Sequence, residues 1–96
     1  MITSKQRGYL RGLANTLPAI FQLGKEGINE NFIKQINEAL EARELIKVKV
    51  LENSGLSSRE ASDIICAALK CEGVQSIGSK CVLYRKSRTK PKIELV

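Results

Sequence analysis

The spacing of the hydrophobic residues switches between a strand period and a helical period along this chain, and this alternation most limits its fold. In one segment Ile46, Val48 and Val50 occupy every second position. Lys47 and Lys49 fill the positions between them, so one face of the segment is apolar and the other is basic. Such alternation is typical of a strand with one buried face. Segments with helical spacing precede and follow it, which predicts a mixed α/β chain.

The same analysis predicts a helix or a strand for most of the chain. In chain order these are a helix at 5–16, a strand at 19–23, a helix at 30–42, a strand at 45–51, a helix at 58–71, and strands at 74–77 and 80–85. The order α-β-α-β-α-β-β contains two β-α-β crossovers, which imply parallel neighbouring strands, and a closing hairpin that adds an antiparallel strand. We therefore expect one small α/β domain with a mixed four-stranded sheet and three helices.

Polar residues mark the start of each predicted helix. Ser4 is expected to cap the first helix and Asn29 the second. Ser57 and Glu60 have the spacing of a capping box before the third helix. The limits of the helices are therefore expected to follow from local sequence.

Charge is distributed unevenly along the 96 residues, whose net charge is +6. Residues 1–25 contain four basic residues and no acidic one, residues 26–79 contain six basic and nine acidic ones, and residues 80–96 contain six basic and one acidic. Two basic ends around an acidic middle predict one face that binds a polyanion and another that avoids it. We expect residues 1–86 to form the domain. Residues 87–96 are basic and have little to bury, so they predict a flexible tail.

The tetrapeptide Gly24-Lys25-Glu26-Gly27 lies between the first strand and the helix capped by Asn29. Glycines at such a junction let the backbone approach a bulky charged ligand, which would then face the free N–H groups at the helix start. A phosphate backbone is the expected ligand, because no acidic residue precedes this loop. An RNA-binding module of the KH class uses such a GxxG loop to clamp nucleotides. The alternative is an ordinary glycine-rich turn.

Cysteine and histidine content argues against metal sites and enzymatic activity. The chain has three cysteines, no histidine and no C-x-x-C motif, so zinc lacks a ligand set and we expect no cofactor. Cys66 and Cys71 are expected on different faces of a helix, and with Cys81 they are interpreted as structural free thiols. No cysteine has an evident general base, which predicts that the chain is not an enzyme. No apolar run reaches the ~20 residues of a membrane span, and residues 1–7 lack the apolar stretch of a signal peptide, so we expect a cytoplasmic protein.

Four segments of the chain form an ordered set of motifs: Ser4-Lys5-Gln6-Arg7 with Leu10-Arg11, Gln22 to Ile28, Leu40 with Glu44 to Val50, and Ile77-Gly78 with Val82 to Arg85. Together, and in this order, they resemble the CRM (chloroplast RNA splicing and ribosome maturation) family in its stand-alone bacterial YhbY form. The resemblance spans about residues 4–86. It implies a KH-like fold similar to the C-terminal domain of bacterial initiation factor three. The chain departs from the family at Asn15, where a histidine is frequent, and at Leu17-Pro18, which are adjacent here.

The resemblance also implies a function. It indicates an RNA-binding protein that associates with rRNA in precursors of the large ribosomal subunit. We further expect the protein to be a monomer. The expected RNA-binding residues come from the loop, from the two basic ends and from the basic face of the strand at 45–51: Gly24, Lys25, Gly27, Lys5, Arg7, Arg11, Lys47, Lys49, Lys80, Arg85 and Lys86. Glu26 is left out, because its carboxylate repels phosphate. Two alternatives stay open: a cofactor for intron splicing or another RNA, and a protein-binding adaptor that docks through the acidic face of the second helix.

Overall fold

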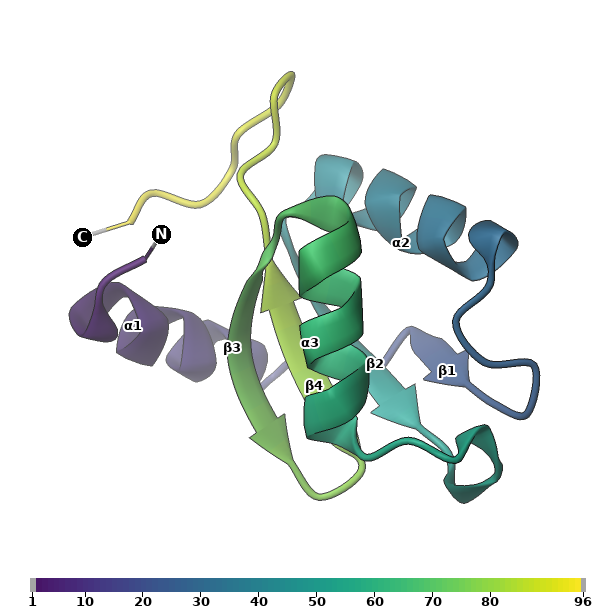
Figure 1. The fold of residues 1–96 in the computed structure, drawn as a ribbon. Coiled ribbons are helices and arrows are strands. Elements are labelled where there is room, and N and C mark those ends of the chain that lie inside the picture. The colour runs from purple at the N-terminus through teal and green to yellow at the C-terminus, as the bar shows by residue number, and fades with distance from the viewer. Residues whose placement is uncertain (1, 96) are drawn as a thin grey trace.

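Helices and strands alternate along residues 2–95, the part of the chain that the computed structural model describes (Figure 1). The elements are α1 (Ser4–Ala14), β1 (Phe21–Leu23), α2 (Glu30–Arg43), β2 (Leu45–Val50), the 3-10 turn η1 (Glu52–Ser54), α3 (Ser58–Leu69), β3 (Glu72–Ile77) and β4 (Lys80–Tyr84). Their order is the predicted α-β-α-β-α-β-β. β1 is shorter than expected, and β3 begins two residues earlier.

The four strands form one mixed sheet in the order β1-β2-β4-β3. β1 and β2 are parallel neighbours, and β4 is antiparallel to both β2 and β3. The expectation that both crossovers join neighbouring strands is wrong for the second one, because β4 lies between β2 and β3. Residues 81–84 of β4 are all buried, which suits a central strand with both faces covered. β3 contains Gly73 beside a register shift and ends at exposed Ile77, features typical of an edge strand.

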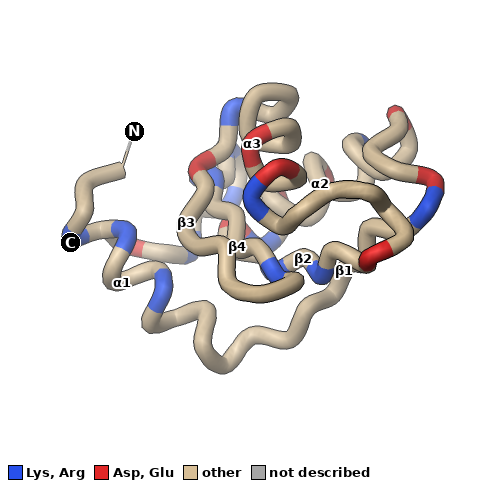
Figure 2. Tube along the Cα trace, turned by 60° about the horizontal axis from the view of Figure 1, so that its bottom comes forward, with Lys and Arg blue, Asp and Glu red and all other residues tan. Residues whose placement is uncertain are grey.

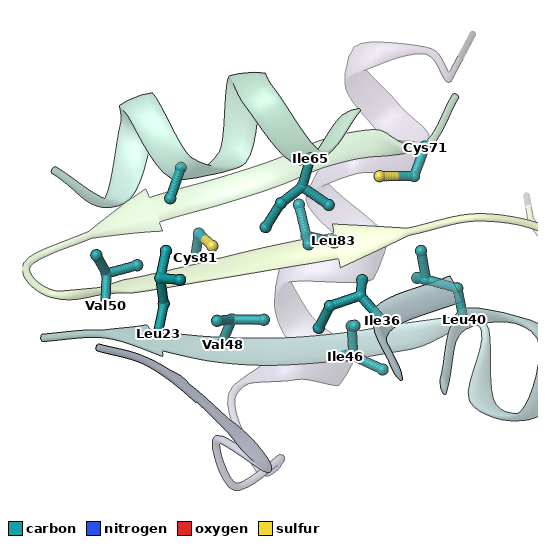
Figure 3. Packing of buried hydrophobic residues seen from close by; sticks show 11 residues of the cluster. Leu23, Ile36, Leu40, Ile46, Val48, Val50, Ile65, Cys71, Cys81 and Leu83 are labelled. Carbon is teal, nitrogen blue, oxygen red and sulfur yellow. The ribbon is translucent and has the colours of Figure 1, made fainter. Parts of the chain in front are cut away.

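The two faces of the sheet bury separate sets of apolar side chains. α2 and α3 cover one face, whose core consists mainly of aliphatic side chains (Figure 3): Leu23, Ile36, Leu40, Ile46, Val48, Val50, Ala61, Ile65, Cys71, Cys81 and Leu83. α1 lies against the other face, where the buried residues are Ile2, Leu10, Ala14, Leu45, Val74, Val82 and Tyr84. The predicted alternation in β2 is confirmed, since its even-numbered residues face α2 and α3.

Side-chain caps fix the start of each helix. Asn29 caps α2, and Ser57 with Glu60 forms the predicted capping box of α3. The prediction of Ser4 as the first cap is wrong by one residue. Thr3 Oγ1 accepts from the N–H of Gln6, and Gln6 Oε1 accepts from the N–H of Thr3. Thr3 is favoured because only its spacing to Gln6 closes both bonds of a capping box.

Two carboxylates near the end of α2 hold the segment that follows β4. Glu44 is fully buried and accepts hydrogen bonds from the backbone N–H groups of Ser87, Lys92 and Ile93. Glu41 accepts from the hydroxyls of Ser87 and Thr89 at 2.8 and 2.9 Å. Ser87 is buried but residues 88–92 are exposed, so the segment buries little, whereas its polar contacts were not visible in local sequence. Flexibility of this segment stays a prediction.

The cysteines are free, as predicted, but two of them are not separated as expected. α3 ends at Leu69, and Lys70 then adopts a left-handed backbone conformation with φ 55°. The chain turns back at this point, and the Sγ atoms of Cys66 and Cys71 lie 3.4 Å apart. The expectation of different faces is wrong because it assumed that the helix continues through Cys71.

Candidate nucleic-acid interface

The glycine loop, residues Gly24–Gly27, connects the end of β1 to the start of α2. The N–H of Gly27 donates to the carbonyl of Gly24 at 3.0 Å, which closes the turn. Gly27 has φ +71°, a conformation that favours glycine, and a Cβ on it would meet no atom within 4 Å. Gly24 has no such backbone constraint, and a Cβ there would make only ordinary contacts, 3.7 Å from Asn53 Oδ1 and 3.8 Å from a Leu51 methyl group. The fold itself therefore explains the glycine at 27 but not the one at 24.

A surface cavity of about 270 Å³ opens between the glycine loop and the first turns of α2. Asn29 Oδ1 accepts from the N–H of Phe32 at 2.8 Å, so the cap already satisfies one of the free donors at this helix end. Polar side chains that the charge-based analysis did not consider also line the cavity: Gln22, Asn31 and Gln35. The cavity thus combines backbone donors and amide groups with Lys25, while Glu26 contributes the opposing charge.

Lysines from two strands meet on the face of the sheet that α1 partly covers. Lys49 of β2 is paired directly with Lys80 of β4, and Lys47 is paired with Val82. Directly opposed residues of antiparallel strands point to the same face, so all three lysines share the face on which Val82 contacts α1. Like charges directly opposite each other are destabilising. The Lys49–Lys80 pair therefore lowers stability unless an anion neutralises it.

This lysine pair lies at the same end of the sheet as the glycine loop. Gln22 is in register with Lys49, and Leu23, the last residue of β1, is in register with Val50. The N–H of Val50 also donates to the carbonyl of Ser79 in the β3–β4 turn. Figure 2 views this end of the molecule and shows basic positions on α1 and beside β2 and β4. Within residues 2–95 the structure has one ion pair, Arg59–Asp63, so no carboxylate neutralises Lys49 or Lys80.

The basic residues of α1 form a second group. Lys5 and Arg11 are exposed, whereas Arg7 is half-buried. Arg7 Nε donates to the carbonyl of Gly73 at 3.2 Å and so ties α1 to β3. Arg7 thus has a structural contact, which the other two basic residues of α1 are not shown to have.

Arg85 and Lys86 lie at the other end of the sheet. Arg85 donates to Asn37 Oδ1 at 2.8 Å, to the Asn37 carbonyl at 3.1 Å and to the Leu69 carbonyl at 3.3 Å. These bonds connect the end of β4 to α2 and to the end of α3. Lys86 is exposed. The structure therefore brings the glycine loop, Lys49 and Lys80 together and separates Arg85 and Lys86 from them.

These features define a class: small α/β modules that present a glycine loop and a basic sheet face at one end. The sequence of residues 2–85 matches the CRS1/YhbY (CRM) domain. The chain belongs to this family, which confirms the resemblance recognised in its sequence motifs.

Individual relatives match over almost their whole length. The chain is 47% identical over 95 residues to "Probable RNA-binding protein YqeI" of Bacillus subtilis (strain 168), covering 99% of each chain. It is 39% identical over 98 residues to a protein of Haemophilus influenzae named "RNA-binding protein", covering 98% of this chain and 94% of that one. The solution structure of protein SAV1595 from Staphylococcus aureus has 47% identity, a TM-score of 0.79 and full coverage of both chains.

These names agree with the prediction that the chain is not an enzyme, because the relatives are named as RNA-binding proteins. The fold class is likewise confirmed by the SAV1595 structure. Among residues 2–95, no helix combines the length and apolar character needed to cross a membrane.

Proposed function

We propose that this chain is an RNA-binding protein that holds RNA by its phosphate backbone at the glycine-loop end of the sheet. The observation that carries the proposal is the Lys49–Lys80 pair, two like charges directly opposed beside the glycine loop and without a carboxylate partner within residues 2–95. Phosphates bound there would remove the repulsion. The names of the family relatives support RNA as the polyanion.

Gly24 supports the same site. Neither the backbone conformation of residue 24 nor a close contact inside the protein requires glycine at this position. A requirement for close approach of a ligand would explain it, as in loops that cradle phosphates. Lys25 then supplies a positive charge next to the backbone donors of the loop.

The finer assignment follows from the family resemblance. We propose that the protein acts in ribosome assembly, binding rRNA of large-subunit precursors in the cytoplasm as a monomer. An alternative role in intron splicing or with another RNA would use the same surface. The adaptor alternative is weakened, because Glu41, one of the acids of the proposed docking face of α2, is already occupied by Ser87 and Thr89.

The RNA-binding proposal is tested by replacing Gly24 and Gly27 together with Asp. Carboxylates there would repel phosphate and block its approach, so we expect affinity for a structured rRNA fragment to fall at least ~100-fold at low salt. For the unmodified protein, if about six phosphates are contacted, raising salt from 50 to 200 mM should weaken binding about 10³-fold. Fluorescence anisotropy measures both effects.

Two control variants separate ligand binding from folding. Gly24→Asp alone should bind weakly and remain as stable as the parent, since residue 24 has ordinary backbone geometry. Gly55→Asp adds the same carboxylate at a left-handed position, φ +76°, outside the glycine loop, and should retain binding. Circular dichroism checks the fold of each variant. Unchanged affinity in a folded Gly24→Asp variant, or a flat salt response, would exclude the proposed site.

The ribosomal assignment is tested by gradient fractionation of a cell lysate followed by immunodetection of the protein. We expect it to sediment with precursors of the large subunit and to be depleted from translating ribosomes. The Gly24→Asp variant should shift to the top of the gradient. Sedimentation with the small subunit, or with no ribosomal particle, would contradict the assignment while leaving RNA binding intact.

A further inference from the structure

Two of the three thiols face each other where α3 ends and β3 begins. The thiol of Cys71 donates to Cys66 Sγ across 3.4 Å. Disulfide formation would need the two sulfur atoms to approach by little more than about 1 Å. Cys66 and the three residues after it belong to α3, whereas Lys70, which is exposed, and Cys71 lie between α3 and β3. Neither helix nor sheet pairing therefore holds the backbone of Cys71, so the adjustment can come from its side.

The cysteines differ in access to solvent. Cys66 is half-buried and lines an open cavity of about 410 Å³ together with Arg7, Arg59 and Ser62. Cys71 is 6% exposed and lies behind it, and Cys81 is completely buried in the core. A small oxidant can therefore reach Cys66 first, and the thiol nearest to the reaction product is that of Cys71.

The ionisation of the thiols agrees with these positions. The hydrogen bond from Cys71 lowers the pKa of Cys66, although partial burial and, to a smaller extent, the carboxylates of Glu72 and Asp63 act in the opposite direction. The same hydrogen bond and burial raise the pKa of Cys71. Burial raises the pKa of Cys81 to about 12, so this thiol stays protonated. Thiolate character and exposure both select Cys66 as the reactive cysteine.

We propose that Cys66 and Cys71 form a reversible thiol oxidation site that reacts with hydrogen peroxide or a small organic peroxide. The Cys66 thiolate attacks a peroxide oxygen and becomes a sulfenic acid, while the other oxygen is protonated and leaves as water from hydrogen peroxide or as the alcohol from an organic peroxide. Cys71 Sγ then attacks Cys66 Sγ. The S–S bond forms, the S–O bond breaks, and the hydroxyl leaves as water with the Cys71 proton. Oxidation of the two thiols thus reduces one hydrogen peroxide to two waters, or one organic peroxide to an alcohol and a water. An external dithiol then reduces the disulfide and returns both electrons.

Metal binding is not a competing role for this pair. Within residues 2–95 no three or more Cys, Asp, Glu or His side chains are grouped so that they could hold a metal ion. The proposed disulfide would instead fasten the end of α3 to the start of β3. The inference is independent of RNA binding, because it concerns thiols on the α3 side of the sheet and its readout is chemical.

The test uses the full chain, reduced, freed of reductant and treated with hydrogen peroxide at neutral pH. We expect the intact mass to fall by about 2 Da, for two hydrogens, and dithiothreitol to restore it. Trypsin cleavage after Arg59, Lys70 and Lys80 places each cysteine on a separate peptide. Mass spectrometry should therefore find peptide 60–70 joined to peptide 71–80, with Cys81 free.

Single substitutions assign the roles. Cys81→Ser should oxidise as the parent does, whereas Cys66→Ser should consume peroxide at least ~10-fold more slowly. Cys71→Ser should accumulate sulfinic acid on Cys66, because the resolving thiol is missing. Sulfinic acid on Cys66 in the parent, a bond to Cys81, a disulfide between two chains, or no reaction faster than that of free cysteine would each overturn the proposal.

Discussion

Irregular basic segments lie at both ends of the sheet, but their polar groups differ in whether they are bonded within the protein. At the C-terminal end, Glu41 and Glu44 accept hydrogen bonds from the backbone and hydroxyls of residues 87–93. At the other end, the glycine loop is closed by a backbone hydrogen bond between Gly27 and Gly24, and Lys25 has no carboxylate partner among residues 2–95. Figure 1 shows the C-terminal segment at the top of the molecule and the β3–β4 turn at the bottom.

This difference distinguishes charged groups that stabilise the fold from charged groups that are available to bind a ligand. The carboxylate of Glu44 is buried, and burial of an ionised group is tolerated only when donors surround it. The C-terminal end is thus a closed polar network that contributes to folding. The glycine-loop end holds directly opposed lysines and open backbone, an arrangement that costs stability and that suits binding of an anion.

We expect the largest effect on stability at the end of the sheet where Glu41 and Glu44 hold residues 87–93. Glu44→Gln removes the charge, and its amide cannot accept from the N–H groups of Ser87, Lys92 and Ile93 together. We expect the free energy of unfolding to fall by about 2–3 kcal/mol, measured by urea titration. RNA affinity of the folded variant should not change.

Glu38→Gln is the matched control for that experiment, since Glu38 is an exposed residue of the same helix. Its stability should stay within about 0.5 kcal/mol of the parent. Loss of RNA binding in folded Glu44→Gln would show that the two ends are not separate in function.

We expect an intermediate effect, on RNA binding, at the glycine-loop end of the sheet. Replacing Lys49 and Lys80 together with Gln should weaken RNA binding about tenfold and lower the salt slope by about 2, one for each lost phosphate contact. Because the substitution removes a like-charge pair, unfolding should become less favourable by a few tenths of a kcal/mol. Anisotropy titrations at several salt concentrations measure the slope.

Lys70→Gln, at the end of α3, is a control that should leave the salt slope unchanged. An equal loss of RNA affinity for that variant would indicate general charge attraction rather than a site.

The smallest effect is expected in how the stability of the protein depends on acid pH. Hydrogen bonds from the Ser87 and Thr89 hydroxyls lower the pKa of Glu41 to about 2. Burial alone would raise the pKa of Glu44, but the N–H groups of Ser87, Lys92 and Ile93 outweigh it and the pKa is lowered. Carboxylates with lowered pKa in the folded state stabilise it above about pH 4.5, and this contribution is lost as pH falls toward the folded pKa. Urea midpoints between pH 5 and pH 2 should therefore decline more steeply for the parent than for Glu41→Gln; parallel curves would contradict the assignment.

The sequence by itself determined the elements, most of the caps and the glycine loop. Alternation in β2 and the Ser57–Glu60 spacing report interactions within a few residues, so they are readable without the fold. Family motifs spread along the chain added the fold class, which the comparisons confirm. Each of these signals either lies within a few residues or is a set of motifs that follow one another in the family order.

Only the tertiary structure decided which charges meet. The pairing of Lys49 with Lys80 depends on β4 entering the sheet between β2 and β3, and the order of strands is not encoded in local periodicity. Arg85, grouped with the basic residues by its charge, is instead bonded to Asn37 and Leu69. The contacts of Glu44 with residues 87–93 join positions more than forty residues apart. Hydrogen bonds between distant segments form only once hydrophobic burial has fixed the chain path, and for that reason charge pattern alone could not assign them.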